Sequence, residues 1–187
     1  MDLAALNEKW SDQEESFITF PAGALTHPLL TENTRTFLTT YGLSESVAPS
    51  LNFAAGPNSL LTVNQYYRID WEGLDDYLVI GHNGSGDPLC IDLRRDNEIV
   101  YLNHDYSFER VWINTTVVQL SRSLLTYKLF NTSLLNLTDP NDFSMRKFSD
   151  AEFSLLQADF QHIDLRALDA GTFWQMELDA LVWERDH

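Results

Sequence analysis

The segment Tyr77–Leu93, YLVIGHNGSGDPLCIDL, places two apolar runs on either side of a glycine-rich turn. Each run is rich in β-branched and aliphatic residues and has the length of a strand. A connection this short joins antiparallel neighbours, because a parallel crossover needs about a dozen residues or more. The segment therefore predicts a β-hairpin in which Gly81, Gly84 and Gly86 supply positive φ angles.

A glycine-rich turn can also bind phosphate, since successive backbone N–H groups form an anion nest. Such a site needs a helix N-terminus after the loop and usually a basic side chain nearby. Here a strand follows the turn, and the chain has no Lys or Arg between Arg68 and Arg94. The hairpin is the favoured interpretation.

Further short runs of β-branched or aromatic residues surround the hairpin, and turn residues separate them. With the two strands of the hairpin, the predicted strands are Leu60–Val63, Tyr66–Ile69, Tyr77–Ile80, Leu89–Leu93, Ile99–Leu102 and Glu109–Ile113. The short connections predict an antiparallel meander of about six strands.

Helical patterns precede this meander. The first is expected over residues 3–17, with Asp2 as its N-cap. A second helix is expected to begin after Thr31 and to end at Gly42. Residues 43–59 contain Pro and Gly and are interpreted as a connecting loop with room for a short strand.

Three more helices are expected after the meander. Asn114 is the predicted N-cap of the first, and Ser149 and Thr172 each begin a capping-box pattern for the other two. Helices at both ends of an antiparallel meander make an α+β fold. We expect residues 1–187 to form a single domain.

Acidic residues outnumber basic ones by 28 to 12, so the formal net charge is −16. The excess is interleaved with apolar residues, and only residues 111–147 carry a positive balance. Nucleic-acid binding needs clustered cations, so a direct DNA or RNA partner is not expected.

The chain also has no apolar run long enough to span a membrane and no basic, apolar leader at its start. Its single cysteine, Cys90, cannot form an internal disulfide, which fits a reducing compartment. We expect a cytoplasmic protein without a membrane partner.

Several residues near the hairpin are of types that carry chemistry. His82, Asp87, Cys90, Asp92, His104 and Asp105 are acceptable metal ligands, but none of them shows a recognised ligand spacing. Alternation along the second strand also separates Cys90 and Asp92 from Leu89, Ile91 and Leu93. Cys90 or Ser85 with His82 or His104 lacks a nucleophile elbow. No metal, cofactor or catalytic residue is therefore expected, and solvated carboxylates are the favoured interpretation of Asp75, Asp76, Asp87, Asp92 and Asp105.

Two groups of aromatic residues are candidates for partner anchors. Tyr66, Tyr67 and Trp71 precede Glu72, and Phe173 and Trp174 begin the last helix. Aromatic residues are enriched at binding hot spots, although at these spacings they more often pack in a core. Trp174 and Trp183 lie nine residues apart, about half a turn out of phase, which leaves one of them room to be exposed.

The hairpin and the strand after it resemble the SUKH superfamily, the group around the Smi/Knr cell-wall regulators and many bacterial immunity proteins. The resemblance is carried by IGHNGSGDPLCIDL (80–93) and EIVYLNHD (98–105). The upstream FPAG (20–23) and the segment from Thr34 to Leu43 are similar to the bacterial immunity subgroup. The likeness spans about residues 18–130 and, more faintly, the final helix.

This resemblance implies an α+β domain that neutralises a toxin of a polymorphic-toxin system, commonly a nuclease, with no enzyme activity and no cofactor. It places the family's motif on Gly81, Gly84, Gly86 and Asp87, which are interpreted as shaping the hairpin. The candidate toxin contacts are Glu72, Asp75, Asp76, Asp87 and Asp105, because an acidic inhibitor complements a basic nuclease groove. The alternatives are a signalling or cell-wall-regulatory binding module and, less favoured, a hydrolase that uses the loop carboxylates or a metal.

Overall fold

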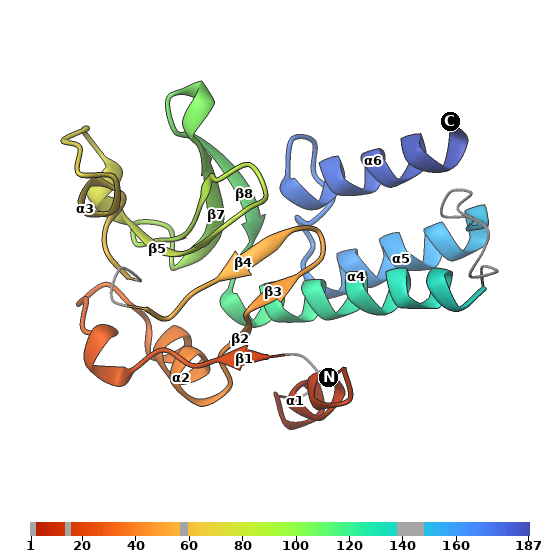
Figure 1. Ribbon diagram of the computed structural model, residues 1–187, viewed down its shortest axis with the longest axis horizontal. Helices are drawn as coiled ribbons and strands as arrows, with labels where there is room; N and C mark the ends of the chain where they lie inside the picture. The colour runs from red at the N-terminus through yellow and green to blue at the C-terminus, as the bar shows by residue number, and fades with distance from the viewer. Residues whose placement is uncertain (1–2, 14–15, 57–59, 138–147) are drawn as a thin grey trace.

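The computed structural model describes residues 3–13, 16–56, 60–137 and 148–187 of the chain (Figure 1). A six-stranded sheet is built in chain order, so that each strand pairs antiparallel with the next. Its strands are β3 (Ser46–Val47), β4 (Leu51–Phe53), β5 (Tyr77–His82), β6 (Pro88–Asp92), β7 (Glu98–Asn103) and β8 (Glu109–Asn114). The predicted α+β class and the antiparallel meander are confirmed.

Four of the six predicted strands are present, and two were assigned to the wrong segments. Leu60–Val63 contributes only an isolated bridge between Thr62 and Leu78. Tyr66–Ile69 is not a strand, because α3 (Val63–Tyr67) begins at a capping box between Thr62 and Gln65. The two remaining strands, β3 and β4, lie in residues 43–59, which were expected to be a connecting loop with room for one short strand.

The N-terminal helices follow the expected order. The first, α1 (Leu3–Ser11), ends earlier than predicted, and β1 (Phe17–Ile18) pairs with β2 (Leu43–Ser44) in a separate two-stranded sheet. The predicted N-cap Asp2 lies outside the described residues. Thr31 caps α2 (Glu32–Thr40) by accepting from the backbone N–H of Thr34, and Gly42 follows the helix with φ +72°.

The three C-terminal helices are α4 (Val117–Leu137), α5 (Asp150–Ile163) and α6 (Phe173–Asp186). Ser149 and Glu152 form the predicted capping box of α5. Thr172 caps α6, but the predicted capping box is incomplete because the Gln175 side chain does not accept from the Thr172 N–H. That N–H donates to the Asp169 carbonyl instead, and the Gln175 side-chain amide donates to the Asp179 carboxylate. Asn114 is not the cap of α4, because it ends β8 and the Thr116 hydroxyl accepts from the Gln119 N–H instead.

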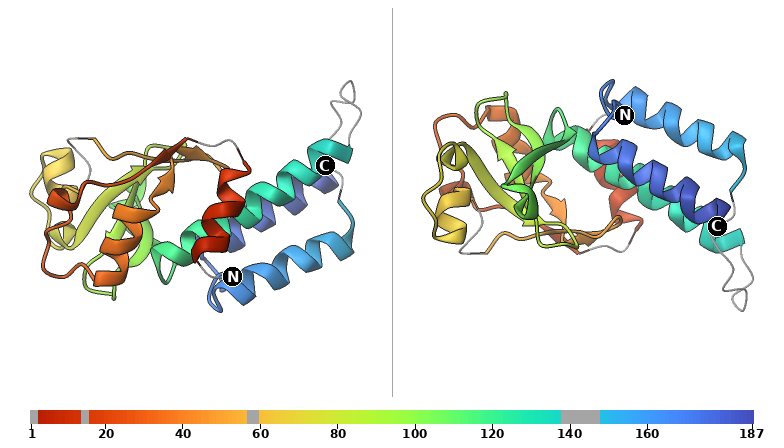
Figure 2. Two further views of the ribbon diagram at one scale, coloured as in Figure 1. Left: turned by 90° about the horizontal axis from the view of Figure 1, so that it is seen from below. Right: turned by 90° about the horizontal axis from the view of Figure 1, so that it is seen from above.

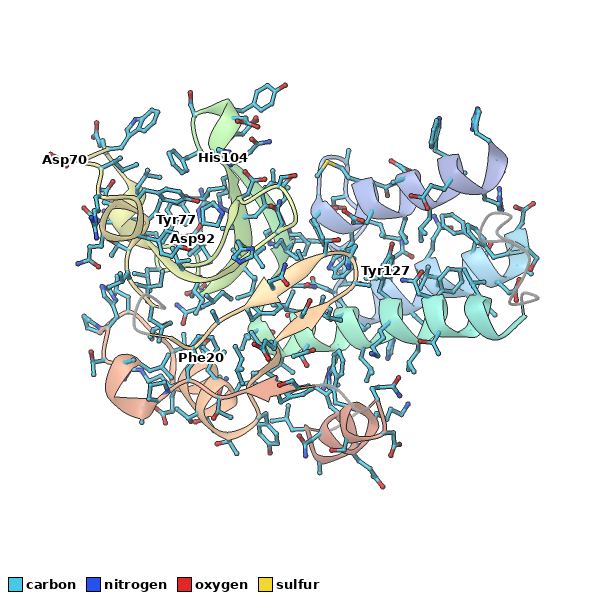
Figure 3. The ribbon with its side chains drawn as sticks, viewed as in Figure 1. Phe20, Asp70, Tyr77, Asp92, His104 and Tyr127 are labelled. Atoms are coloured by element: carbon cyan, nitrogen blue, oxygen red, sulfur yellow. The ribbon has the colours of Figure 1, made fainter. Side chains whose placement is uncertain are left out.

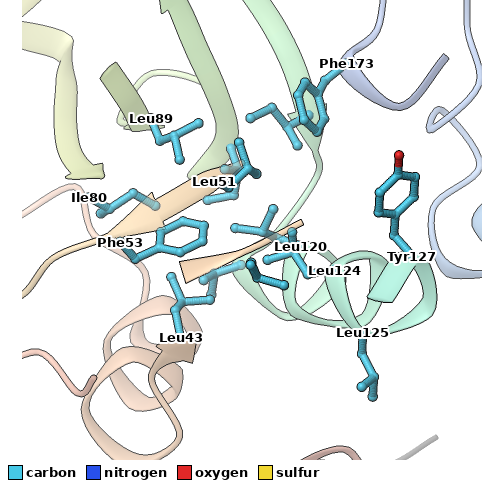
Figure 4. Packing of buried hydrophobic residues seen from close by; sticks show 14 of the residues in the cluster. Leu43, Leu51, Phe53, Ile80, Leu89, Leu120, Leu124, Leu125, Tyr127 and Phe173 are labelled. Atoms are coloured by element: carbon cyan, nitrogen blue, oxygen red, sulfur yellow. The ribbon is translucent and has the colours of Figure 1, made fainter. Parts of the chain in front are cut away.

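The two faces of the sheet have separate apolar clusters. Leu89, Ile91 and Leu93 belong to the main core, which the sheet shares with α2 and the C-terminal helices (Figures 2 and 4). Cys90 lies on the opposite face in a smaller cluster that α3 and the neighbouring loop cover. The predicted alternation along this strand and the interior position of Cys90 are both confirmed.

A buried polar network joins the sheet to the helices. The Asn114 amide accepts from the Trp174 indole at 3.0 Å and donates to the Ser123 hydroxyl at 3.2 Å. Asp164, before α6, accepts from the backbone N–H of Thr115 at 2.8 Å. Trp174 is fully buried whereas Trp183 is 64% exposed, as the half-turn offset between them had suggested.

Candidate partner-binding surface

The glycine hairpin, residues 81–88, is shaped by one glycine with a positive φ angle, one glycine in a tightly packed position and one side chain that closes the turn. Gly86 has φ +85°, as predicted, but Gly81 and Gly84 do not have positive φ angles. Gly81 is needed for space, because a Cβ there would collide with the carbonyl oxygen of Asn52 in β4. The Asn83 side chain closes the turn by accepting from the backbone N–H groups of Ser85 and Asp87, at 3.0 and 2.9 Å.

Asp87 is 5% exposed and joins the hairpin to the end of β7. Its carboxylate accepts from the His104 backbone N–H at 2.9 Å and from the Asn83 amide at 2.8 Å, and His104 Nδ1 lies 2.7 Å away. Burial by itself would raise the pKa of Asp87, but these hydrogen bonds hold it below its usual value. The predicted toxin contact at Asp87 is thus an interior side chain, whereas its position suits the shaping of the hairpin.

A second contact joins the hairpin to α3. The Tyr67 hydroxyl donates to the carbonyl oxygen of Gly86 at 3.2 Å. Burial raises the pKa of Tyr67 to about 12, so the hydroxyl keeps its proton and remains a donor. The hairpin therefore holds two separate segments: the α3 region through Tyr67, and η3 (His104–Tyr106) through Asp87.

The remaining predicted toxin contacts lie in those two segments. Glu72 and Asp105 are exposed, and Asp105 lies 3.4 Å from the His104 ring. Asp75 accepts from the Thr62 hydroxyl at 2.9 Å, and Asp76 pairs with Arg94 at 2.6 Å. In Figure 3, Asp70 and His104 lie at the same end of the molecule, far from Tyr127 on α4.

Three exposed aromatic side chains and one exposed isoleucine lie in the same two segments. We call Tyr66, Ile69, Trp71 and Tyr106 the aromatic surface, and their exposed fractions are 39%, 38%, 47% and 69%. The rings of Tyr66 and Tyr67 are in contact, and both Tyr67 and Trp71 contact Phe108 edge-on. The sequence suggested Tyr66, Tyr67 and Trp71 as partner anchors. It did not suggest Tyr106, because no local pattern predicts that this side chain is exposed.

Several chemistry-bearing residues around the hairpin are buried or held in structural contacts. Among the described residues, no group of three His, Cys, Asp or Glu side chains is placed to hold a metal ion. Burial raises the pKa of the Cys90 thiol, which disfavours the nucleophilic thiolate. The Asp92 carboxylate is buried and accepts from the Arg110 guanidinium at 2.9 Å.

A cleft of about 630 Å³ lies on the other side of the hairpin, where Asn83, Gly84 and Ser85 face the β3–β4 turn and α6. Glu177 and Glu184, two turns apart on α6, line it together with Tyr127 of α4. Burial and the nearby Glu184 carboxylate raise the pKa of Glu177 to about 7. No prediction from sequence had included this cleft.

Comparison with known proteins decides the family. A family model described as SUKH-4 immunity protein matches residues 2–180. The chain belongs to the SUKH-4 immunity protein family. The match confirms the predicted SUKH relationship, which was seen over residues 18–130 and the final helix, and extends it to α1 and α5.

No curated protein and no solved structure gives a significant match to this SUKH-4 chain. Within the described residues, no helix has the length and apolarity required to cross a membrane. Membership of the SUKH-4 family supports an immunity role. The contacts of Tyr67 and Asp87 join the glycine hairpin to the two segments in which Glu72, Asp105 and the exposed aromatic residues lie.

Proposed function

We propose that this SUKH-4 immunity protein binds a cognate polymorphic toxin in the bacterial cytoplasm and blocks its active site or substrate channel. The observation that carries the proposal is the family match over residues 2–180. Neutralisation is proposed to occur by protein–protein contact alone, with the whole chain acting as one domain and without a catalytic step or a cofactor.

We further propose that the toxin is a nuclease with a basic substrate groove. The net charge of −16 supports this, because opposite charges steer association and raise the on-rate. Glu72, Asp75 and Asp105 are the exposed residues among the predicted contacts. Glu72 and Asp105 are the favoured contacts, because Asp75 accepts from the Thr62 hydroxyl and Asp76 pairs with Arg94.

Co-expression with the product of the adjacent toxin gene, inactivated in its catalytic site, tests the proposal. We expect the two proteins to co-purify and the complex to block nucleic-acid cleavage by the active toxin at a one-to-one ratio. The on-rate is expected to fall about tenfold or more between low and physiological salt. Absence of both binding and protection would refute the immunity role.

Paired variants then test the location of the contact. Neutralising Glu72 and Asp105 with Glu72→Gln and Asp105→Asn is expected to slow association more than the control pair Glu8→Gln and Asp12→Asn. The control removes the same charge from exposed positions in and just after α1, which lies at the bottom of Figure 1, away from α3 and the β7–β8 turn at its upper left. Equal effects of the two pairs would show that only overall charge matters.

A further inference from the structure

The aromatic surface is unusual because its large exposed side chains lie in two segments that ring contacts join. Exposed apolar residues are usually scattered singly, and a contiguous group is typical of a binding surface. Tyr66, Ile69 and Trp71 belong to one segment, and Tyr106 lies two residues before Phe108, whose ring contacts Trp71. The chain of ring contacts through Tyr67 and Phe108 connects the α3 segment to the β7–β8 turn.

The backbone under this surface is held in place by Asn64, which is buried. Its side-chain amide donates to the Trp71 carbonyl and accepts from the Trp71 N–H, both at 3.0 Å. Its backbone carbonyl accepts from the Ile69 N–H, also at 3.0 Å. Because these bonds fix the loop before a partner arrives, binding loses less conformational entropy.

Carboxylates are frequent in the two segments that carry the aromatic surface. Residues 62–76 and 103–109 together contain six acidic residues and one arginine, Arg68. Asp70, Glu72 and Asp105 are exposed and are the sequence neighbours of Trp71 and Tyr106. A purely apolar partner would have to remove these charges from water without compensation, which is unfavourable.

We infer that the aromatic surface is the anchor for arginine side chains on the basic face of the cognate toxin. A guanidinium stacks on an aromatic ring and at the same time binds a carboxylate through two hydrogen bonds. Trp71 and Tyr106 supply exposed rings for stacking. Their sequence neighbours Asp70, Glu72 and Asp105 supply exposed carboxylates for hydrogen bonding. The inference rests on the proposed function and adds the chemistry by which the partner is recognised.

Single variants in the full-length protein test the anchor. Tyr106→Ala is expected to weaken the affinity for the inactivated toxin about tenfold to a hundredfold, as loss of a hot-spot residue does. Trp71→Ala is expected to act in the same direction, and its thermal midpoint is measured to exclude unfolding. The matched control is Trp183→Ala, which removes an exposed tryptophan from α6 and is expected to change the affinity less than about twofold. Unchanged affinity in both surface variants would overturn the inference and leave the immunity role intact.

A peptide probe separates the inference from the proposed function. We expect the capped peptide Gly-Arg-Gly-Arg-Gly to shift the amide resonances of Trp71 and Tyr106, its lysine counterpart to shift them less and its citrulline counterpart not at all. Such shifts in a protein that binds no toxin would refute immunity but support the arginine anchor. Absence of shifts, or a concentration-dependent dimer that Tyr106→Ala dissociates, would overturn the anchor.

Discussion

The Asp87 carboxylate and His104 are joined twice, through the backbone N–H of His104 at 2.9 Å and through its ring Nδ1 at 2.7 Å. One residue lies in the glycine hairpin and the other begins η3 after β7, 17 residues later. This contact fixes the position of the turn that carries Asp105 and Tyr106. An interior carboxylate thus determines the geometry of an exposed surface.

Replacement of Asp87 by Asn is expected to destabilise the fold by about 2 kcal/mol at pH 7. An amide cannot accept from both Asn83 and His104, because one of its two ends is a donor. Urea unfolding measures the loss, and Asp105→Asn, at an exposed position, is the control with little expected effect.

The pH dependence of the Asp87 variant follows from the lowered pKa of this carboxyl. Its stabilising contribution is fully present above the usual aspartate value of 3.8 and is lost as the pH falls through the lower value of the folded state. The stability difference between wild type and Asp87→Asn should therefore shrink below about pH 4. A difference that stays constant down to pH 2 would contradict the assignment.

Replacement of Gly81 by Ala is expected to destabilise the protein by more than about 3 kcal/mol, because the new Cβ would collide with the backbone of β4. Gly86→Ala should lose about 1 kcal/mol through its left-handed backbone conformation. Gly23→Ala is the control, since its Cβ would meet nothing within 4 Å. Thermal midpoints in the order Gly23, Gly86, Gly81, from highest to lowest, are the expected result.

Replacement of Asn114 by Ala is expected to destabilise the fold by about 2–3 kcal/mol, because the buried Trp174 indole would lose its acceptor. Trp174→Phe removes the donor instead, so a double-mutant cycle of urea unfolding isolates the pair. A coupling energy of zero would show that the two side chains stabilise the protein independently.

Replacement of Glu177 by Gln is expected to stabilise the protein at pH 8 by about 1 kcal/mol, a value reduced because the cleft admits water. The pKa of Glu177 is raised from 4.5 to about 7, so the folded state holds a proton that the unfolded state has lost. Wild-type stability therefore falls as the pH rises from about 4.5 to 7, and the variant should lack this decline. Urea unfolding at pH 5 and pH 8 measures it, with Glu8→Gln as the control.

Local patterns explain why some elements could be predicted. The hairpin runs at Tyr77–Ile80 and Leu89–Leu93 have a strand period and a glycine turn, and Ser149 with Glu152 forms a complete capping box; all of these signals lie within a few residues. The errors arose where two local signals competed. Tyr66–Ile69 has the composition of a strand, but the capping box at Thr62 begins a helix there.

The proposed binding surface was less predictable because it depends on distant contacts. Glu72 and Asp105 were predicted as acidic candidates without any indication that Tyr67 and Asp87 would hold their segments to one hairpin. Asp87 had the same residue type as the exposed candidates, and only its burial distinguishes it. Nothing in the residues around Tyr106 indicates that its side chain would lie open to solvent.

The sequence alone determined the α+β class, the central antiparallel strands, the acid excess and the SUKH relationship, because periodicity, turn chemistry, charge and motif are local properties. The tertiary structure decided which carboxylates are buried, which glycine is required for space rather than for φ, and which aromatic side chains lie together. Those properties are set by strand pairing and by packing between residues far apart in the chain, and neither is encoded in any single segment.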